Sequence, residues 1–114
     1  LEVSRGLEKR GIDSHFIATG QTGIMIAGSG LPLDCIVADF VAGAAEQLVI
    51  ENQHHSVVVV EGQGSIVHPS YSGVTLSLLH GCLPHALILC FEAGRASVGG
   101  IDHVPIPELR RIAE

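Results

Sequence analysis

The sequence predicts an α/β domain with a mainly parallel sheet flanked by helices. Three short apolar runs, at residues 15–19, 57–60 and 86–90, have the composition of strands. Stretches with helical periodicity separate them, and strands that alternate with helices are typical of a parallel sheet. Because 114 residues suffice for one core, we expect residues 1–114 to form a single domain.

The first half of the chain begins with a short helix. Basic residues fill its last turn, and Gly11 occupies the usual stop position after residues 1–10. HFIAT at 15–19 predicts a strand that leads into a glycine-rich turn. The apolar stretch that follows predicts a short helix ending near Gly28 or Gly30.

The middle of the chain contains the longest helical pattern and the most apolar strand. We expect Asp39 to cap a helix that runs to about Asn52, because its apolar residues recur at helical spacing. The four valines at 57–60 predict a strand buried on both faces, as in a parallel sheet.

The remaining elements follow the same alternation. Ser72 is expected to cap a helix through His80, which Gly81 would end. ALILC at 86–90 predicts the third strand, and Pro107 is expected in the first turn of a last helix.

Composition excludes several functional classes. Hydrophobic residues make up 46% of the chain and charged residues 16%, which is typical of a globular protein. The net charge of −6 argues against a nucleic-acid or membrane partner, since both need basic patches. Glycines and prolines interrupt the uncharged stretch 62–91, so we do not expect it to span a membrane.

Cysteine usage and the first residues indicate the compartment. The three cysteines show no paired spacing, which favours a reducing, cytoplasmic environment. The charged start of the chain also lacks the apolar region of a signal peptide.

Polar and glycine-rich residues follow all three predicted strands. In open parallel sheets, ligands bind beyond the carboxyl ends of the strands, which share one edge. The predicted ligand-binding residues after the first two strands are Thr19, Gly20, Gln21, Thr22, Gly62, Gln63, Gly64 and Ser65. The alternative is that these turns only reverse the chain.

Glu61 is the candidate catalytic residue. A carboxylate directly after a buried strand is disfavoured by desolvation, which a divalent cation or a bound donor would offset. Mg²⁺ beside substrate phosphates takes one or two carboxylates, and Asp39 is a weaker candidate for the second, because it also suits a plain helix cap. Gly62 and Gly64 would let a ligand approach the backbone.

Arg95 is the only Lys or Arg between residues 11 and 109, and it follows the third predicted strand. It could clamp a phosphate or carboxylate, or it could be a surface arginine paired with Glu92. His68 and Tyr71 could line the pocket or serve packing.

Two further patterns are weaker. Ser65 and His68 lack both the G-x-S-x-G elbow and an orienting acid. His80-x-Cys82-x-x-His85 has metal-like spacing, but it straddles a predicted helix end and a predicted strand start.

Four segments resemble the C-terminal domain of a bacterial and archaeal family long labelled as of unknown function. They are FIATGQTGIMIAG (16–28), DFVAGAAEQLV (39–49), VVVEGQGSIVHPSYSGVTLSLLHG (58–81) and ALILCFEAGR (86–95). Some members of this family are assigned as D-glutamate N-acetyltransferases. The resemblance implies a P-loop NTPase-like, three-layer fold similar to dethiobiotin synthetase, in which an E-G-x-G segment helps bind magnesium and nucleotide. Glu61, Gly62 and Gly64 match that segment, and Thr19 and Gly20 would lie near substrate.

The phosphate loop of the G-x-x-x-x-G-K-[ST] type is not found in these residues. The resemblance places it upstream of residue 1, together with a Rossmann-like domain, so we expect an N-terminally truncated domain. An apolar face left uncovered in this way could allow assembly into a homo-oligomer.

Three functions remain open. As an acyltransferase acting on a small-molecule substrate, the protein would bind acetyl-CoA, with Glu61 as general base and Arg95 on a substrate carboxylate. As a ligase-type enzyme it would bind ATP and Mg²⁺, with Glu61 as metal ligand. The third function is that of a non-catalytic binding or assembly module.

Overall fold

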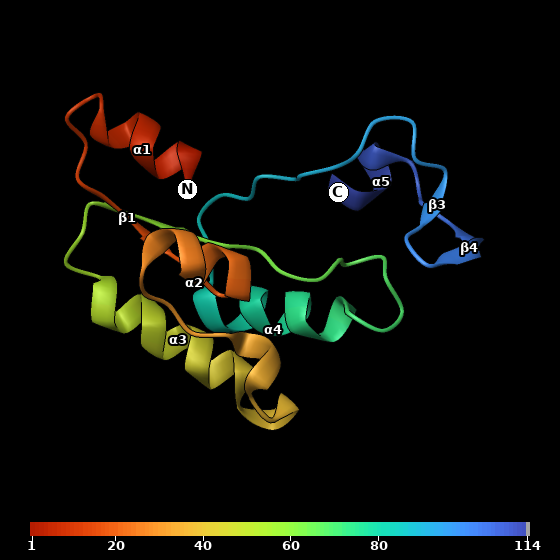
Figure 1. Ribbon diagram of the computed structural model, residues 1–114, viewed down its shortest axis with the longest axis horizontal. Coiled ribbons are helices and arrows are strands. Elements are labelled where there is room, and N and C mark those ends of the chain that lie inside the picture. The colour runs from red at the N-terminus through yellow and green to blue at the C-terminus, as the bar shows by residue number, and fades with distance from the viewer. Residues whose placement is uncertain (114) are drawn as a thin grey trace.

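The computed structural model describes residues 1–113, which form an α/β fold around a two-stranded parallel sheet (Figure 1). The elements in chain order are α1 (Glu2–Glu8), β1 (Ser14–Ile17), α2 (Gln21–Ala27), the 3₁₀ helices η1 (Leu33–Cys35) and η2 (Ala38–Phe40), α3 (Val41–Asn52), β2 (Val57–Val60), α4 (Ser72–Cys82), β3 (Ser97–Val98), β4 (Ile101–Pro105) and α5 (Leu109–Ala113). No described helix has the length and apolar character needed to cross a bilayer.

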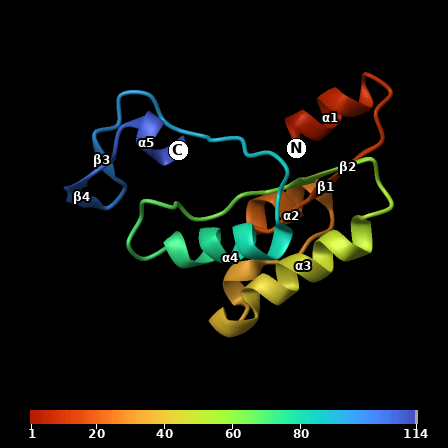
Figure 2. The ribbon, with the colours of Figure 1, turned by 180° about the vertical axis from the view of Figure 1, so that it is seen from behind.

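The sheet lies between two helical layers. β1 and β2 pair in parallel, with Ser14 opposite Val57 and Ile17 opposite Val60. Figures 1 and 2 both show α3 and α4 side by side on one face, and α1 packs on β1 and β2 from the other side. The sequence therefore predicted the class, the first two strands and their parallel pairing correctly.

The core lies between η1, α3 and α4. Leu33, Val41, Ala45 and Leu78 form its buried cluster, against which Val60 of β2 also packs. The four valines of β2 are half-buried rather than fully buried. Burial of these apolar side chains against helices is what holds the short strands in place.

The prediction of a third strand at 86–90 is wrong for the described chain. These residues belong to no helix or strand, and all of them are exposed. An apolar run becomes a strand only when a neighbouring strand accepts its backbone hydrogen bonds, and no such neighbour lies beside it here. The antiparallel pair β3–β4 could not be predicted, because each strand is short and lacks an alternating pattern.

Several helix boundaries also need correction. Asp39 lies within η2, and α3 begins after Phe40 without a side-chain cap, so Asp39 is not an N-cap. Ser72 is the first residue of α4 rather than its cap. Pro107 lies two residues before the first residue of α5.

Gly81 does not end α4, which continues to Cys82 and closes at Leu83 in the left-handed conformation. A Cβ atom at Gly81 would lie 2.2 Å from the carbonyl oxygen of Ala42. Glycine is therefore needed there for close packing of α4 on α3.

Candidate functional site at the carboxyl ends of β1 and β2

The site is built where the parallel strands β1 and β2 end. The Glu61 N–H donates to the Ile17 carbonyl at 2.9 Å, which extends the sheet by one bond. Immediately beyond it, the Thr19 hydroxyl donates to the Glu61 carbonyl at 2.8 Å. Parallel pairing thus brings Thr19 and Glu61 together although they are 42 residues apart in sequence.

The Glu61 carboxylate bridges the two strand ends. Its Oε2 accepts the backbone N–H groups of Thr19 and Gly20, each at 2.9 Å. Thr19 is fully buried and Gly20 precedes the first residue of α2. A negative charge near the start of a helix is favourable, and the two N–H donors offset its partial desolvation. We call this arrangement of Glu61, Thr19 and Gly20 the carboxylate clasp.

Gly23 makes room for the clasp. A Cβ atom at this buried position of α2 would lie 2.2 Å from Glu61 Oε2 and 2.6 Å from Oε1. α2 can therefore pack against the carboxylate only because residue 23 has no side chain. Sequence reasoning missed this role, although a glycine inside a helical pattern is a known signal of close approach.

The loop after β2 is hydrogen-bonded to Thr19 of the carboxylate clasp and to α4. The Gln63 side-chain amide donates to the Thr19 carbonyl, and the Thr75 hydroxyl of α4 donates to the Gln63 carbonyl at 2.8 Å. Gly64 has φ +67°, and a Cβ atom there would lie 2.5 Å from the Tyr71 carbonyl oxygen. Hydrogen bonds thus connect four of the predicted residues, Thr19, Gly20, Glu61 and Gln63. The positive φ and the close Tyr71 carbonyl explain why residue 64 is a glycine.

Other predicted residues border the clasp without joining it. Gln21 and Thr22 are exposed in the first turn of α2. A Cβ atom at Gly62 would meet nothing within 4 Å, so no contact inside the chain requires glycine there. The rings of His68 and Tyr71 lie 4.4 Å apart, beyond a turn in which the His68 N–H donates to the Ser65 carbonyl.

Arg95 is not brought to the clasp. Its guanidinium pairs with Glu92 at 3.1 Å, both side chains are largely exposed, and its other close neighbour is Gly99. Figure 1 shows β3, the strand that follows it, beside α5 and far from α2. The expected convergence of three strand ends is therefore wrong, because it depended on a strand at 86–90.

Asp39 is the weaker candidate for a second metal-binding carboxylate beside Glu61. Asp39 is exposed in η2, and among residues 1–113 no three His, Cys, Asp or Glu side chains are grouped so as to hold a metal ion. Glu61 Oε1, which lies close to Gly23 of α2, accepts no hydrogen bond within that range.

Two hollows of about 290 and 280 Å³ lie along β1 away from the clasp. One lies between β1, residues 29–30 and the end of α3, and the other between α1, β1 and the end of α2. None of the predicted site residues lines either hollow.

The fold and the fastened strand ends define an α/β domain whose candidate site lies at the carboxyl ends of parallel strands. Residues 1–114 match the family described as "Domain of unknown function (DUF1611_C) P-loop domain", and the chain belongs to this DUF1611 family.

Solved and curated relatives agree with this assignment. The crystal structure of a DUF1611 family protein from Anabaena variabilis is 42% identical, with a TM-score of 0.92 over 97% of this chain and 32% of that one. Two relatives named D-glutamate N-acetyltransferase, from Tritonibacter scottomollicae and a Pseudoalteromonas species, are 46% and 41% identical over all 114 residues. The chain spans 34% of each of these two relatives.

Proposed function

We propose that this chain supplies one side of the active site of an N-acetyltransferase that moves an acetyl group from acetyl-CoA to the amine of D-glutamate. The observation that carries the proposal is that the alignments with two relatives of that name cover all 114 residues, at 46% and 41% identity. The carboxylate clasp supports it, because it fixes an ionisable group on a rigid sheet edge, where a site can be held accurately.

The reaction requires a proton acceptor. The substrate amine attacks the thioester carbonyl carbon and the carbon–sulfur bond breaks. The proton that the new amide nitrogen loses goes to the leaving sulfur, so CoA departs as the thiol. The ammonium form of the amine must lose a proton before it can attack. Glu61 Oε1 is our candidate for this base, since Oε2 is occupied by two backbone N–H groups and holds the carboxylate in place.

Exposed polar groups beside the clasp suit an acidic amino acid. Gln21 and Thr22 present side chains at the first turn of α2, where the helix start favours anions. We assign them to substrate or CoA oxygens, and we assign Ser65, His68 and Tyr71, on the loop after β2, to the same ligand. Arg95 is left out of this assignment because its contacts are local.

The test uses a chimera of the Tritonibacter scottomollicae relative, in which these 114 residues replace the segment that aligns with all of them. Glu61→Gln keeps an acceptor oxygen for Thr19 and Gly20 but removes the base, so turnover should fall about 100-fold or more with an unchanged melting temperature. Glu92→Gln is the matched control, since this exposed carboxylate also follows an apolar run. Wild-type turnover by Glu61→Gln would overturn the role of Glu61.

The co-substrate that is consumed distinguishes an acetyltransferase from an ATP-dependent ligase. Acetyl transfer predicts CoA release without ATP and no loss of activity with EDTA. An ATP- and Mg²⁺-dependent ligase predicts ADP or AMP formation that EDTA abolishes. A chimera that folds yet releases neither CoA nor nucleotide product with D-glutamate would contradict the proposed function.

A further inference from the structure

Thr75 of α4 donates a hydrogen bond that leaves its own helix. A hydroxyl inside a helix commonly donates to the carbonyl one turn earlier, and Ser77 does so, donating to the Gly73 carbonyl at 2.8 Å. The Thr75 hydroxyl donates to the Gln63 carbonyl at 2.8 Å, in a part-buried position on the loop after β2. Two hydroxyl side chains of one helix therefore have different kinds of partner, and that of Thr75 belongs to the candidate site.

Gln63 connects Thr75 to the carboxylate clasp. Its side-chain amide donates to the Thr19 carbonyl, while the Thr19 N–H donates to Glu61 Oε2. A Cβ atom at Gly20 would lie 3.5 Å from Glu61 Oε2 and 3.6 Å from Gln63 Oε1, so both side chains lie over the same face of that glycine. The backbone of Gln63 is thus held by α4, and its side chain by the end of β1.

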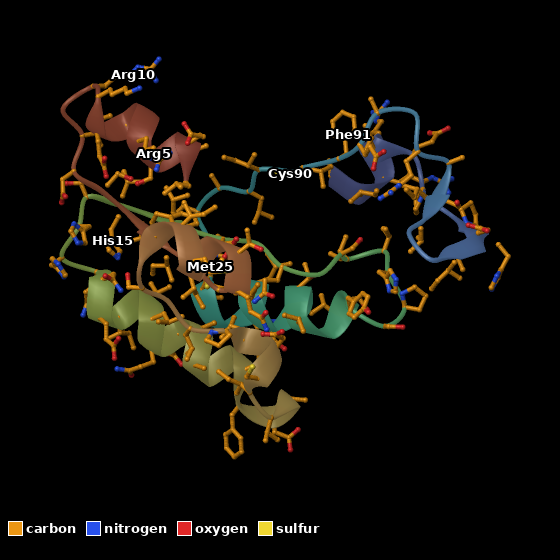
Figure 3. The ribbon with its side chains drawn as sticks, in the orientation of Figure 1. Arg5, Arg10, His15, Met25, Cys90 and Phe91 are labelled. Carbon is orange, nitrogen blue, oxygen red and sulfur yellow. The ribbon has the colours of Figure 1, made fainter. Side chains whose placement is uncertain are left out.

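The loop at residues 62–65 depends on such contacts for its conformation. Gly62 and Gly64 flank Gln63, and glycines give a backbone more freedom than other residues do. A Cβ atom at Gly64 would lie 2.5 Å from the Tyr71 carbonyl oxygen and 3.0 Å from Thr75 Oγ1, so this part of the loop lies directly against α4. Figure 3 shows that the chain after β2 passes α2, on which Met25 is labelled, and then turns back into α4.

We propose that Thr75 is a positioning residue for the acetyl transfer, an inference that rests on the proposed function. It holds the loop at residues 62–65 in the conformation that presents its ligand-binding groups beside the carboxylate clasp. Thr75 acts through Gln63, to whose carbonyl its hydroxyl proton is donated. The Glu61 carboxylate has its own two N–H donors, so loss of the Thr75 hydroxyl should weaken ligand binding and leave the base in place.

The kinetic test uses the chimera with the Tritonibacter scottomollicae relative. Thr75→Val keeps nearly the same shape but removes the donor, so KM for D-glutamate or acetyl-CoA should rise about 10-fold while kcat changes less than about 3-fold. Thr75→Ser restores the hydroxyl and should return KM to within about 2-fold of the wild-type value. Ser77→Ala is the matched control, because it removes a hydroxyl that is bonded within α4, and it should leave both constants unchanged.

NMR relaxation supplies a readout that does not depend on activity. In the 114-residue chain, the backbone order parameters of Gln63 and Gly64 should be about 0.85, as in rigid backbone, and should fall below about 0.6 in Thr75→Val. Thr75→Ser and Ser77→Ala should both keep the wild-type values. If Thr75→Val does not fold, Thr75→Ala removes the same donor and introduces the residue that most favours a helix.

The two readouts separate this inference from the proposed function. Unchanged order parameters without the Thr75 hydroxyl, or a raised KM that Thr75→Ser does not restore, would overturn the role of Thr75. A lower kcat with an unchanged KM would also overturn it, because the hydroxyl would then act on the base. Absence of acetyl transfer in the unsubstituted chimera would refute the proposed function alone, and the order parameters would then decide whether Thr75 holds the loop.

Discussion

Two apolar runs in this chain are each followed by a glutamate, and the structure treats them differently. Residues 57–60 form β2, and Glu61 then accepts two backbone N–H groups from the neighbouring strand end. Residues 86–91 stay exposed, and Glu92 pairs only with Arg95 three residues on. The difference lies in the partner. β2 has β1 beside it and α3 and α4 beneath it, whereas no strand within residues 1–113 lies beside residues 86–91.

The largest expected effect on the free energy of unfolding comes from comparing a buried isoleucine with an exposed one. Ile17 of β1 is 3% exposed and Ile88 is 68% exposed. Ile17→Ala should lower the free energy of unfolding of the 114-residue chain by about 2–5 kcal/mol, because it leaves a cavity in the core. Ile88→Ala should change it by less than about 0.5 kcal/mol. Urea titration measures both, and comparable losses would mean that residues 86–91 are packed in solution.

The second prediction concerns the helix pair beneath β2. Gly81→Ala forces a methyl group to within 2.2 Å of the Ala42 carbonyl oxygen and should cost about 1–3 kcal/mol of unfolding free energy. Gly43→Ala in α3 meets open space and should stabilise the chain by up to about 1 kcal/mol through helix propensity. If both variants were stabilised, the close contact between α3 and α4 would not exist.

The third prediction compares the two glutamates. Glu61→Ala leaves the Thr19 and Gly20 N–H groups without their acceptor and should cost about 1–3 kcal/mol in the 114-residue chain. Glu92→Ala removes an exposed ion pair and should cost less than about 1 kcal/mol. Thermal unfolding at two salt concentrations checks this, since salt should weaken only the effect at Glu92.

Much of the first half of the fold could be predicted from sequence, because the signals that mark its helices and strands lie within each element. Gly28 marks the end of α2 and adopts positive φ. α1 ends at Glu8, three residues before Gly11, which also adopts positive φ. Parallel pairing of β1 with β2 followed from their alternation with helices, and it led correctly to Thr19, Gly20, Glu61 and Gln63 as neighbours.

What sequence could not give depends on contacts between distant residues. A glycine inside a helical pattern signals a close approach at Gly23, but it does not show that the approaching group is the Glu61 carboxylate. No local pattern reveals that Thr75 binds the Gln63 carbonyl. Likewise, the sequence of residues 86–90 shows that the segment is apolar, but it does not show whether another strand is available to pair with it. The misplacement of Arg95 followed from that one error.

The smallest expected effect concerns the opposite ends of the same two strands. The Asp13 carboxylate accepts hydrogen bonds from His55 Nδ1 at 2.9 Å and from the Ser56 N–H at 3.0 Å, and the His55 ring stacks on His15. The hydrogen bond with His55, followed by that from Ser56, lowers the pKa of Asp13 below its ordinary value of 3.8. This pairing fastens the start of β1 to the turn before β2, as the carboxylate clasp fastens their ends.

Because the folded-state pKa of Asp13 is lowered, its contribution to stability is complete above pH 3.8 and is lost as pH falls through the folded-state pKa. Asp13→Asn keeps an acceptor for Ser56 but cannot titrate, so its unfolding free energy should fall less between pH 5 and about pH 2.5 than that of the wild type. Asp102→Asn in β4, where the side chain is exposed, is the matched control and should follow the wild-type profile. Parallel profiles for the wild type and Asp13→Asn would show that only the carboxyl ends of β1 and β2 are fastened by a carboxylate.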